Sequence, residues 1–461
     1  MKQIKPLPAL SENSFLRYFA FIALYFSQGI IEGITLFGIP AWMAINGKTA
    51  TEIATYGSIV AIAFSLKILL APMMERFTFL PMGRRRPWLL FGQFGILCSF
   101  IGLYFVPDPL NNLALLTAVV IVIHVFEIFQ DIATDSLAID IVPLEKQGKA
   151  NSLMWGSKTV GISISLAVGS WLINQYGFSQ AVLWVSVPIC FTMLVPLLLR
   201  ERQGEKLLPW SSGTTSPESA LLKIDSWGKL FKSFKQVVLL PNTLLFCLIL
   251  FMNKCAFHYL ITLLPIFTIQ ELGWNNIDYS NAFSTSSLVG GVIGMVMGGV
   301  LITRFGTVRM LQGCLLLTGL LIASMGFSKL LWQNTIYVSA FIAIFNLMDT
   351  LITIGKFATA MQACWKRVSA LQFTFFMTIA NAGLVAGPAL LGFLRTYFGW
   401  QIIFLIFTLM VVGVAVLLQF LKMNTHLKQV ENLETNYLEK ESKLSNQMVL
   451  NYDISQTPTA T

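Results

Sequence analysis

"LPIFTIQELGWNNIDYSN", residues 264–281, resembles "IPAWMAINGKTATEIATYG", residues 39–57, at the same point of a long apolar pattern. A second pair follows in the same order, since "SWLINQYGFSQAVLW" at 170–184 resembles "GFLRTYFGWQIIFLI" at 392–406. Short basic loops, "MERFTFLPMGRRRPW" and "ITRFGTVRM", also recur at matching places. Several matches in one order predict an internal duplication, so the fold should consist of two copies of one unit.

Apolar segments dominate both copies. The 461 residues are 55% hydrophobic and 11% charged, and the mean hydropathy is +0.70. Soluble domains carry about 25% charged residues. Runs of about 20 apolar residues, long enough to cross a bilayer as helices, recur from Phe15 to Leu421. They predict an all-α membrane protein with twelve transmembrane helices in two six-helix pseudo-repeats, the fifth helix at Ala150–Leu172.

The basic residues predict the orientation of these helices. Of 31 Lys and Arg residues, 24 fall in the termini, a central polar segment and alternate loops. By the positive-inside rule, both termini are cytoplasmic in a multi-pass plasma membrane protein, here of a bacterial inner membrane. The predicted parts are a cytoplasmic N-terminus (1–14), two six-helix bundles (15–199 and 241–421), a cytoplasmic linker (200–240) and a flexible cytoplasmic tail (422–461).

Several classes of function are disfavoured by what the sequence lacks. The net charge of +9 follows from topology, so we expect the lipid bilayer rather than nucleic acid as a partner. The six cysteines show no CxxC spacing, and we predict no metal site and no cofactor. No GxxxxGK[ST] pattern is present, which argues against an ATP-driven pump in this chain. We expect a monomer.

The loop after the second predicted span carries a family motif. "LAPMMERFTFLPMGRRRPWLL" (70–90) resembles the loop motif of the major facilitator superfamily, with Glu75 in place of the usual Asp and a longer spacing. "FQDIATDSLAIDIV" (129–142) resembles the fourth span of its muropeptide permease (AmpG-like) and acetyl-CoA transporter branch, which includes some siderophore permeases. "ELGWNNIDYS" and "VAGPALLGFLRTYFGW" fit that branch in order. The resemblance, from Phe15 to Leu421, implies a permease fold and proton coupling.

The fourth predicted span, "HVFEIFQDIATDSLAID" (124–140), is unusually acidic for a membrane helix. His124, Glu127, Asp131 and Asp135 follow a spacing of 3, 4 and 4, which places them on one helical face. A charge at mid-bilayer costs roughly 3 kcal/mol, so these groups should face a cavity or each other. Glu127 and Asp131 lie near the midplane and are the first proton-coupling candidates.

Two alternatives stay open for this span. Asp131 could instead form a permanent ion pair with Lys158 or Lys67. His124 could join a proton relay or serve as a hydrogen-bonded packing residue.

The cytoplasmic end of the same span predicts a gate. Asp135 and Asp140 lie level with the Arg-rich loop, and we expect them to pair with its arginines. Breaking such pairs would let the two halves separate. The predicted gate residues are Glu75, Arg76, Arg84, Arg85, Arg86, Asp135 and Asp140.

Charged residues in other spans extend the predicted site. When the two copies are aligned on a shared proline, Gly29 and Gly33 stand against Lys254 and His258, so one copy presents glycines where the other presents cations. We expect Lys254 to bind an anionic substrate group or to neutralise Glu32. Glu32 and Asp349 are further coupling candidates, and the predicted cavity residues are Gln28, Lys158, Lys254, His258, Asn346, Lys356 and Asn381.

Together these features predict a secondary active transporter, driven by protons, that moves a polar or anionic small-molecule solute by alternating access. A muropeptide is the first expectation, and a siderophore or acyl-CoA-type solute is the alternative. A non-transporting membrane receptor or assembly factor, or a membrane-bound acyltransferase using His124, are the competing classes. A six-plus-six repeat has no explanation in catalysis, so we predict that the protein is not an enzyme.

Overall fold

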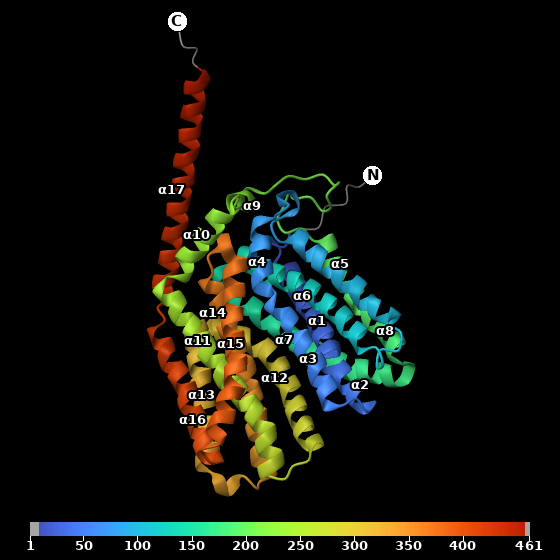
Figure 1. Ribbon diagram of the computed structural model, residues 1–461. Helices are drawn as coiled ribbons and strands as arrows, with labels where there is room; N and C mark the ends of the chain where they lie inside the picture. Colours follow the sequence, from blue (N-terminus) through green and yellow to red (C-terminus); the bar gives the residue numbers. More distant parts are fainter. Residues whose placement is uncertain (1–8, 457–461) are drawn as a thin grey trace.

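The computed structural model describes residues 9–456 as a bundle of long helices, and within this range it contains no strand (Figure 1). The helices of the first half are α1 (Ser14–Glu32), α2 (Ile39–Ile45), α3 (Ala50–Ser65), α4 (Lys67–Arg76), α5 (Arg86–Gly102), α6 (Leu113–Ile141), α7 (Gln147–Tyr176) and α8 (Phe178–Leu198). The linker holds α9 (Pro217–Leu221) and α10 (Trp227–Val238). The second half has α11 (Pro241–Ile266), α12 (Asn276–Phe305), α13 (Thr307–Phe327), α14 (Thr335–Ala363), α15 (Ser369–Arg395) and α16 (Trp400–Leu417), followed by α17 (Met423–Gln456). The predicted all-α membrane fold is confirmed.

The transmembrane helices match the prediction with one instructive difference. In residues 9–456, eleven helical stretches are long and apolar enough to cross a membrane, five before the linker and six after it. The exception is α7, where we predicted the fifth span. It has 30 residues, about 45 Å at the usual helical rise, but its sequence is more polar. Because α7 packs chiefly against α1 and α12, much of its surface faces protein rather than lipid.

The duplication shows in equivalent helix pairs. In the first half α1 packs on α7, and in the second half α11 packs on α15. Each pair meets at a glycine. A Cβ added to Gly29 of α1 would lie 2.2 Å from the carbonyl oxygen of Lys158, and one added to Gly383 of α15 would lie 2.4 Å from that of Phe251. Any side chain at these two positions would force the helices apart.

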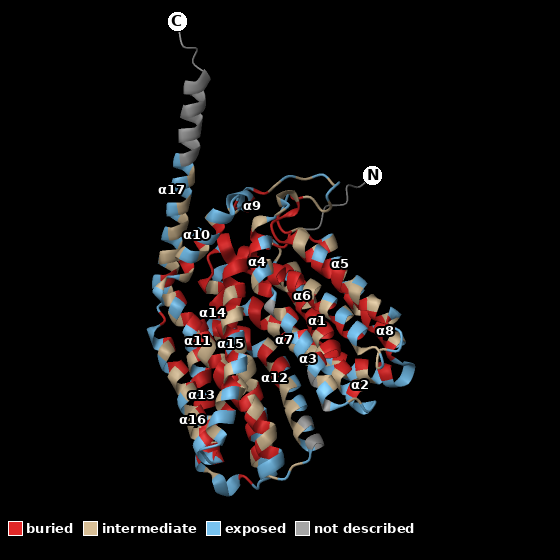
Figure 2. Cartoon of the chain, viewed as in Figure 1, coloured by how far each residue is buried: buried red, intermediate tan, exposed pale blue. Residues whose placement is uncertain are grey.

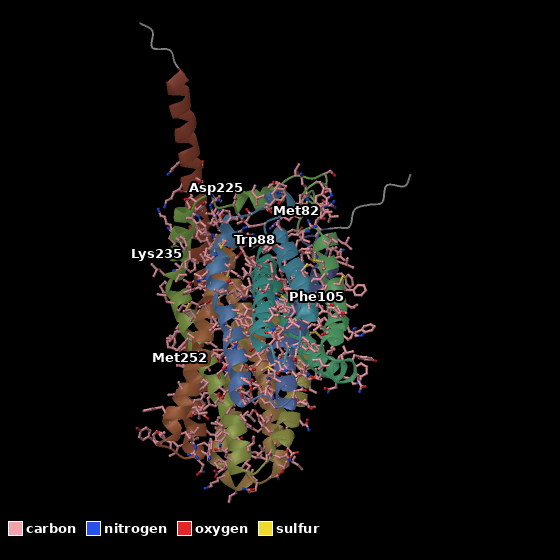
Figure 3. All side chains as sticks on the ribbon, turned by 45° about the vertical axis from the view of Figure 1, so that its right-hand side comes forward. Met82, Trp88, Phe105, Asp225, Lys235 and Met252 are labelled. Carbon is pink, nitrogen blue, oxygen red and sulfur yellow. The ribbon has the colours of Figure 1, made fainter. Side chains whose placement is uncertain are left out.

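The linker helices and α17 lie at one end of the molecule, the upper end in Figure 1, which we call the terminal side. Figure 3 places Met82, Trp88 and Asp225 at this same end, where the loop before α5 meets the linker. At the opposite end the helices are joined by short loops.

The two halves meet mainly toward the terminal side. There α4 packs against α15, and α7 packs against α12 and α14. Direct hydrogen bonds cross the boundary, such as Asn151 Nδ2 to the Ile354 carbonyl oxygen at 2.6 Å and Gln362 Nε2 to that of Leu144 at 3.3 Å. Figure 2 shows buried residues crowding this upper region, whereas the outward faces of the helices are exposed.

The tail differs from the flexible segment that we predicted. Residues 423–456 form the helix α17, and its first turns pack on the bundle. His426 is buried, and its Nε2 donates to the Ala363 carbonyl oxygen at 2.8 Å. The prediction considered only apolar content, but polar side chains of the tail supply its contacts.

Candidate functional site

The acidic face of α6 meets a lysine at the start of α4. Lys67 forms an ion pair with Asp131, and its Nζ lies 3.9 Å from Asp135 Oδ2. The Tyr25 hydroxyl of α1 donates a hydrogen bond to Asp135. Lys67 is therefore shared by two carboxylates, and of the two alternatives for Asp131 the structure selects Lys67 rather than Lys158.

His124 and Glu127 form the far end of this polar chain. Glu127 Oε2 lies 2.6 Å from His124 Nδ1, and Thr35 Oγ1 lies 3.0 Å from His124 Nε2. The hydroxyl of Tyr56 donates to the Thr35 carbonyl oxygen at 2.7 Å. His124 is fully buried and hydrogen-bonded on both ring nitrogens, as a packing residue or a relay member would be.

A second ion pair joins α7 to α1. Lys158 Nζ lies 2.8 Å from Glu32 Oε1, and each side chain is 13% exposed. The expectation that Lys254 neutralises Glu32 is therefore wrong. The cause is local, because the close approach of α1 and α7 at Gly29 places Glu32, one turn further along α1, beside Lys158.

We call Glu32, Glu127, Asp131 and Asp135 the acidic cluster. In residues 9–456, Glu127 Oε1 and Asp135 Oδ2 are buried without a hydrogen-bond partner. Gln28 Nε2 donates to Gln130 Oε1 at 2.7 Å within the same region. Sequence reasoning missed Tyr25 and Gln130, because an isolated Tyr or Gln in an apolar span carries no periodic signal.

The second half presents cations. Lys356 Nζ lies 3.4 Å from Asn253 Oδ1, and Asp349 interacts electrostatically with both Lys356 and Lys254. Within the described residues, neither lysine forms an ion pair with a carboxylate. Lys254 also interacts electrostatically with Lys158 across the boundary between the halves. We call the region between the charged side chains of the two halves the central space.

The other predicted cavity residues have different surroundings. Half-buried His258 interacts electrostatically with both lysines of the second half, one turn away from Lys254. Asn346 Nδ2 donates to Ser286 Oγ at 2.7 Å and so joins α14 to α12. Asn381 is exposed on α15, and in residues 9–456 no hydrogen bond connects it to the lysines.

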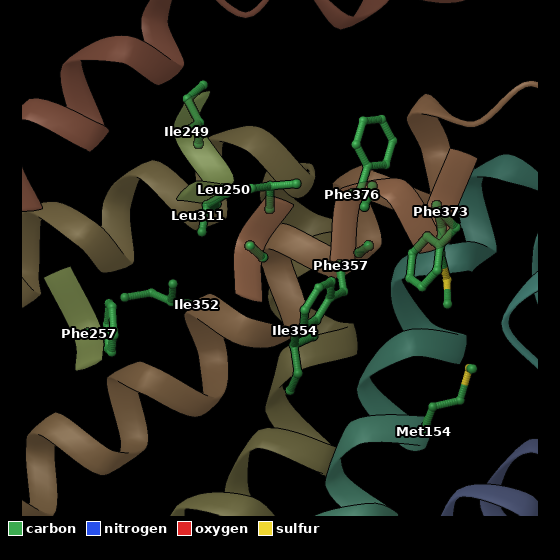
Figure 4. Close-up of a cluster of buried hydrophobic side chains, with 14 of the residues drawn as sticks. Met154, Ile249, Leu250, Phe257, Leu311, Ile352, Ile354, Phe357, Phe373 and Phe376 are labelled. Carbon is green, nitrogen blue, oxygen red and sulfur yellow. The ribbon is translucent and has the colours of Figure 1, made fainter. Parts of the chain in front are cut away.

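Aromatic rings close the central space toward the terminal side. Trp155 of α7 stacks on Phe357 of α14, with centroids 4.8 Å apart and planes 9° from parallel. Lys158 Nζ lies 5.4 Å from the Trp155 ring, and Lys356 Nζ lies 5.3 Å from the Phe357 ring. Figure 4 shows Phe357 and Phe373 among buried side chains of the second half, with Met154 of α7 nearby. This aromatic floor carries one lysine from each half.

Beyond the floor lies a fully buried charge cluster, the latch, formed by Glu75, Arg84, Arg85 and Asp140. Arg84 Nη2 contacts Glu75 Oε2 at 2.5 Å, and Arg84 Nη1 contacts Asp140 Oδ2 at 3.1 Å. Arg85 contacts the same two carboxylates, each at 3.0 Å. The charges balance, and the predicted pairing of Asp140 with this loop is confirmed.

The latch holds the second half directly. Arg84 donates to the carbonyl oxygens of Lys366 at 2.7 Å and Arg367 at 2.6 Å. Glu75 Oε1 accepts from the Ala370 backbone at 2.6 Å, and Asp140 Oδ1 accepts from Ser369 Oγ at 2.9 Å. The latch side chains are at most 1% exposed, so the terminal side is closed at the latch. The acidic cluster is more accessible, because the Asp131 side chain is 18% exposed.

Three predicted gate residues lie elsewhere. Asp135 points to Tyr25 and Lys67, because it lies more than one turn from Asp140 along α6. Arg86 donates instead to carbonyl oxygens that include Pro196 at 2.7 Å and Leu207 at 2.5 Å, and so anchors the linker.

Arg76 likewise has no ion pair within the described residues. It lines a cavity of about 500 Å³ with aromatic side chains and Lys223. It is the last residue of α4 and follows Glu75 directly, so its side chain projects about 100° around the helix from that of Glu75. Among residues 9–456, no group of three His, Cys, Asp or Glu side chains is placed to hold a metal ion.

Known proteins are similar to this chain in sequence or in fold. The chain is 24% identical over 385 residues to the anhydromuropeptide permease of Escherichia coli K12, covering 83% of this chain and 75% of that protein. Its fold is similar to the crystal structure of FucP, a Major Facilitator Superfamily transporter in the outward conformation, with a TM-score of 0.66, 13% identity and coverage of 88% and 98%. The human organic anion transporter MFSD10 gives a TM-score of 0.60 at 14% identity and the same coverage.

The family resemblance expected from the sequence is thereby confirmed. The relatives are transporters, and the low identity to the solved structures limits that likeness to the fold. The sequence pattern of the Major Facilitator Superfamily matches residues 21–368, about three quarters of the chain. The chain therefore belongs to the Major Facilitator Superfamily.

Proposed function

We propose that this protein is a proton-coupled secondary transporter that moves an anionic, muropeptide-like solute by alternating access and catalyses no covalent reaction. Family membership supports transport. The observation that carries the finer proposal is the opposite charge excess of the two halves. The first half sets four carboxylates against Lys67, Lys158 and His124, whereas the second sets Lys254 and Lys356 against one carboxylate.

The acidic cluster is suited to hold a proton. One ammonium group, that of Lys67, faces both Asp131 and Asp135 and can neutralise only one of them. Two like charges that share a site do not both ionise readily, so the second carboxyl should be neutral. Asp135 Oδ2 and Glu127 Oε1 accept no hydrogen bond, which supports this, because a buried charged oxygen without a hydrogen bond is costly. The coupling proton would therefore move among Asp131, Asp135 and Glu127.

The lysines of the second half are suited to hold the solute. Lys254 and Lys356 face the central space without a close carboxylate, within residues 9–456. A muropeptide is a sugar–peptide that carries carboxylates, and each could take the place of the missing counter-ion. Trp155, half-buried on the floor between the halves, stacks one ring face on Phe357, so a sugar would contact its other face.

The latch supplies the second state of the cycle. A closed latch would block passage on the terminal side, so solute would reach the central space from the opposite side. If the terminal side is cytoplasmic, solute and proton enter from outside, and separation of Arg84 from the backbone of Lys366 and Arg367 releases them inward. A monomer in the bilayer suffices for this cycle.

The coupling proposal is tested in proteoliposomes with an imposed inward proton gradient and a labelled anhydromuropeptide. Asp135→Asn mimics a permanently neutral carboxyl, so gradient-driven accumulation should be lost while solute exchange without a gradient persists. Asp278→Asn, an exposed carboxylate at the start of α12, is the matched control and should accumulate normally. Full accumulation by both Asp131→Asn and Asp135→Asn would refute coupling at this pair.

The solute class is tested by thermal unfolding of the purified protein with muropeptides, siderophores and acyl-CoA thioesters. A ligand that binds only the folded state raises the melting temperature, by a free energy of about 2.7 kcal/mol at 100 times its Kd. We expect stabilisation by muropeptides. A shift only with siderophores or thioesters would transfer the proposal to that class, and no shift would favour a non-transporting receptor.

A further inference from the structure

The loop of the second half that the latch binds also has contacts on its opposite side. This gate loop, residues 364–368, joins α14 to α15. Arg84 of the first half binds it through the carbonyl oxygens of Lys366 and Arg367. The side chain of Arg367 points away from the latch and is 1% exposed, so its charge must be neutralised by something other than the latch.

The tail helix supplies that neutralisation. Glu434 of α17 accepts two bonds from the Arg367 guanidinium, one from Nε at 3.0 Å and one from Nη2. The same carboxylate accepts from Trp365 Nε1 at 2.7 Å, and the guanidinium lies 4.0 Å from the centre of the Tyr437 ring. Two-pronged carboxylate–guanidinium contacts are strong and directional, so Glu434 fixes the orientation of the gate loop.

The linker joins the same arrangement. Arg367 Nη1 donates to the Leu221 carbonyl oxygen at 2.8 Å. The part of the linker that precedes Leu221 is docked on the first half, since the Lys206 backbone donates to the Pro81 carbonyl oxygen at 2.7 Å. Arg367 therefore connects the tail, the linker and the gate loop at the place where the halves must separate.

We propose that Glu434 is a positioning residue for the transport cycle, acting through Arg367 to hold the gate loop where Arg84 binds it. The tail helix thus stabilises the arrangement that is closed on the terminal side. This rests on the proposed function, because alternating access requires the latch to open. No pattern in the tail sequence points to this role, since one Glu among several in a polar helix carries no signal of its own.

Cys364 of the gate loop reports opening without any solute. This residue is 7% exposed and lies near Glu75, Asp135 and Asp140 of the first half. Burial, reinforced by these carboxylates, raises the pKa of the Cys364 thiol well above its usual value. Since the thiolate is the reactive form, the closed state should react slowly with a maleimide, and opening should speed the reaction.

The experiment measures maleimide labelling of the full-length protein in nanodiscs, in a variant that retains only Cys364. Losing a charged hydrogen-bond partner should shift the closed–open balance by roughly tenfold. We therefore expect Glu434→Gln to label roughly tenfold faster. Glu434→Asp, which keeps the charge, should label at a rate between those of the parent and Glu434→Gln. Glu439→Gln, which alters an exposed carboxylate on the same helix, should label at the parent's rate.

A second cysteine distinguishes a specific effect on the gate loop from a general loss of folding stability. A parallel variant retains only Cys314 of α13, which is also 7% exposed but lies outside the gate loop. Faster labelling of Cys364 with unchanged labelling of Cys314 supports the proposal. Equal acceleration at both cysteines, or no acceleration at Cys364, overturns it. Because neither solute nor proton gradient enters this assay, its failure is distinguishable from failure of the transport assay.

Discussion

The two halves of the molecule share one helical plan but differ in how their charges are paired. In the first half, Lys67 and Lys158 each contact a carboxylate, and further carboxylates remain in excess. In the second half, Lys254 and Lys356 have no ion pair within residues 9–456. The proposed division of proton binding and solute binding between the two copies rests on this difference.

The packing of equivalent helices shows how this difference arises. Gly29 lies on α1 and faces Lys158 on α7, whereas Gly383 lies on α15 and approaches Lys254 on α11. The glycine and the lysine have therefore exchanged helices between the copies. In the first half this arrangement leaves Glu32 of α1 free to pair with Lys158.

The basic loops differ in the same sense. Arg84 and Arg85 of the first half are buried in the latch, whereas Arg304 and Arg309 at the equivalent loop of the second half are exposed. The first half therefore holds the arginines of the latch, and the second half contributes mainly backbone groups to it.

The largest expected effect comes from breaking a pair in the first half. Lys67→Met leaves Asp131 and Asp135 without their shared cation. Removing one partner of a buried ion pair costs about 3–5 kcal/mol, so the melting temperature should fall by several degrees. Thermal unfolding followed by tryptophan fluorescence in detergent measures this.

The matched double variant tests the cause. Lys67→Met combined with Asp131→Leu removes both charges and should recover most of the lost stability. If the double variant is as unstable as Lys67→Met alone, packing rather than the unpaired charge explains the loss.

The sequence predicted the features of the two halves that produce a periodic or compositional pattern. Apolar runs gave the helices, and the spacing of Glu127, Asp131 and Asp135 gave their common face. It did not predict the pairing partners, because those depend on how helices are rotated against each other. The Glu32–Lys158 pair and the placement of Asp135 outside the latch both follow from that rotation.

The tail was unpredictable for a different reason. Its contacts use single polar side chains, such as His426 and Glu434, that meet partners far away in the chain. A sequence read for apolar content gives no sign of such contacts.

The next largest effect is expected in the linker, which binds the basic loop of the first half. Glu205 of the linker accepts hydrogen bonds from Ser216 and Ser219 and lies near Glu201, which binds the backbone of Arg85 and Arg86. Burial, reinforced by Glu201, raises the pKa of Glu205 to about 7.

The sign of the resulting pH dependence follows from proton counts. Between the ordinary value of 4.5 and about 7, the folded state binds more protons than the unfolded state, so stability falls as pH rises through this window. Glu205→Gln should flatten that slope and be more stable than the parent at pH 8, by about 1–2 kcal/mol. Melting temperatures from pH 5 to 8 measure it, with exposed Glu218→Gln as the control. An unchanged slope would mean that Glu205 is already ionised in the folded protein at pH 5.

The smallest expected effect has the opposite sign to that of Lys67→Met and tests the comparison most directly. Lys254→Met removes a half-buried cation that lacks an ion pair in the described chain, so no carboxylate loses its only partner. Stability without solute should rise by about 1 kcal/mol, since an unpaired charge is costly to bury. The stabilisation by an anhydromuropeptide should fall, whereas Lys254→Arg should retain it. Melting temperatures with and without solute give both quantities. If Lys254→Met is destabilised as strongly as Lys67→Met, then the lysines of the two halves are paired alike. The signs of the stability changes in Lys67→Met and Lys254→Met, rather than their sizes, therefore test whether one copy binds the proton and the other the solute.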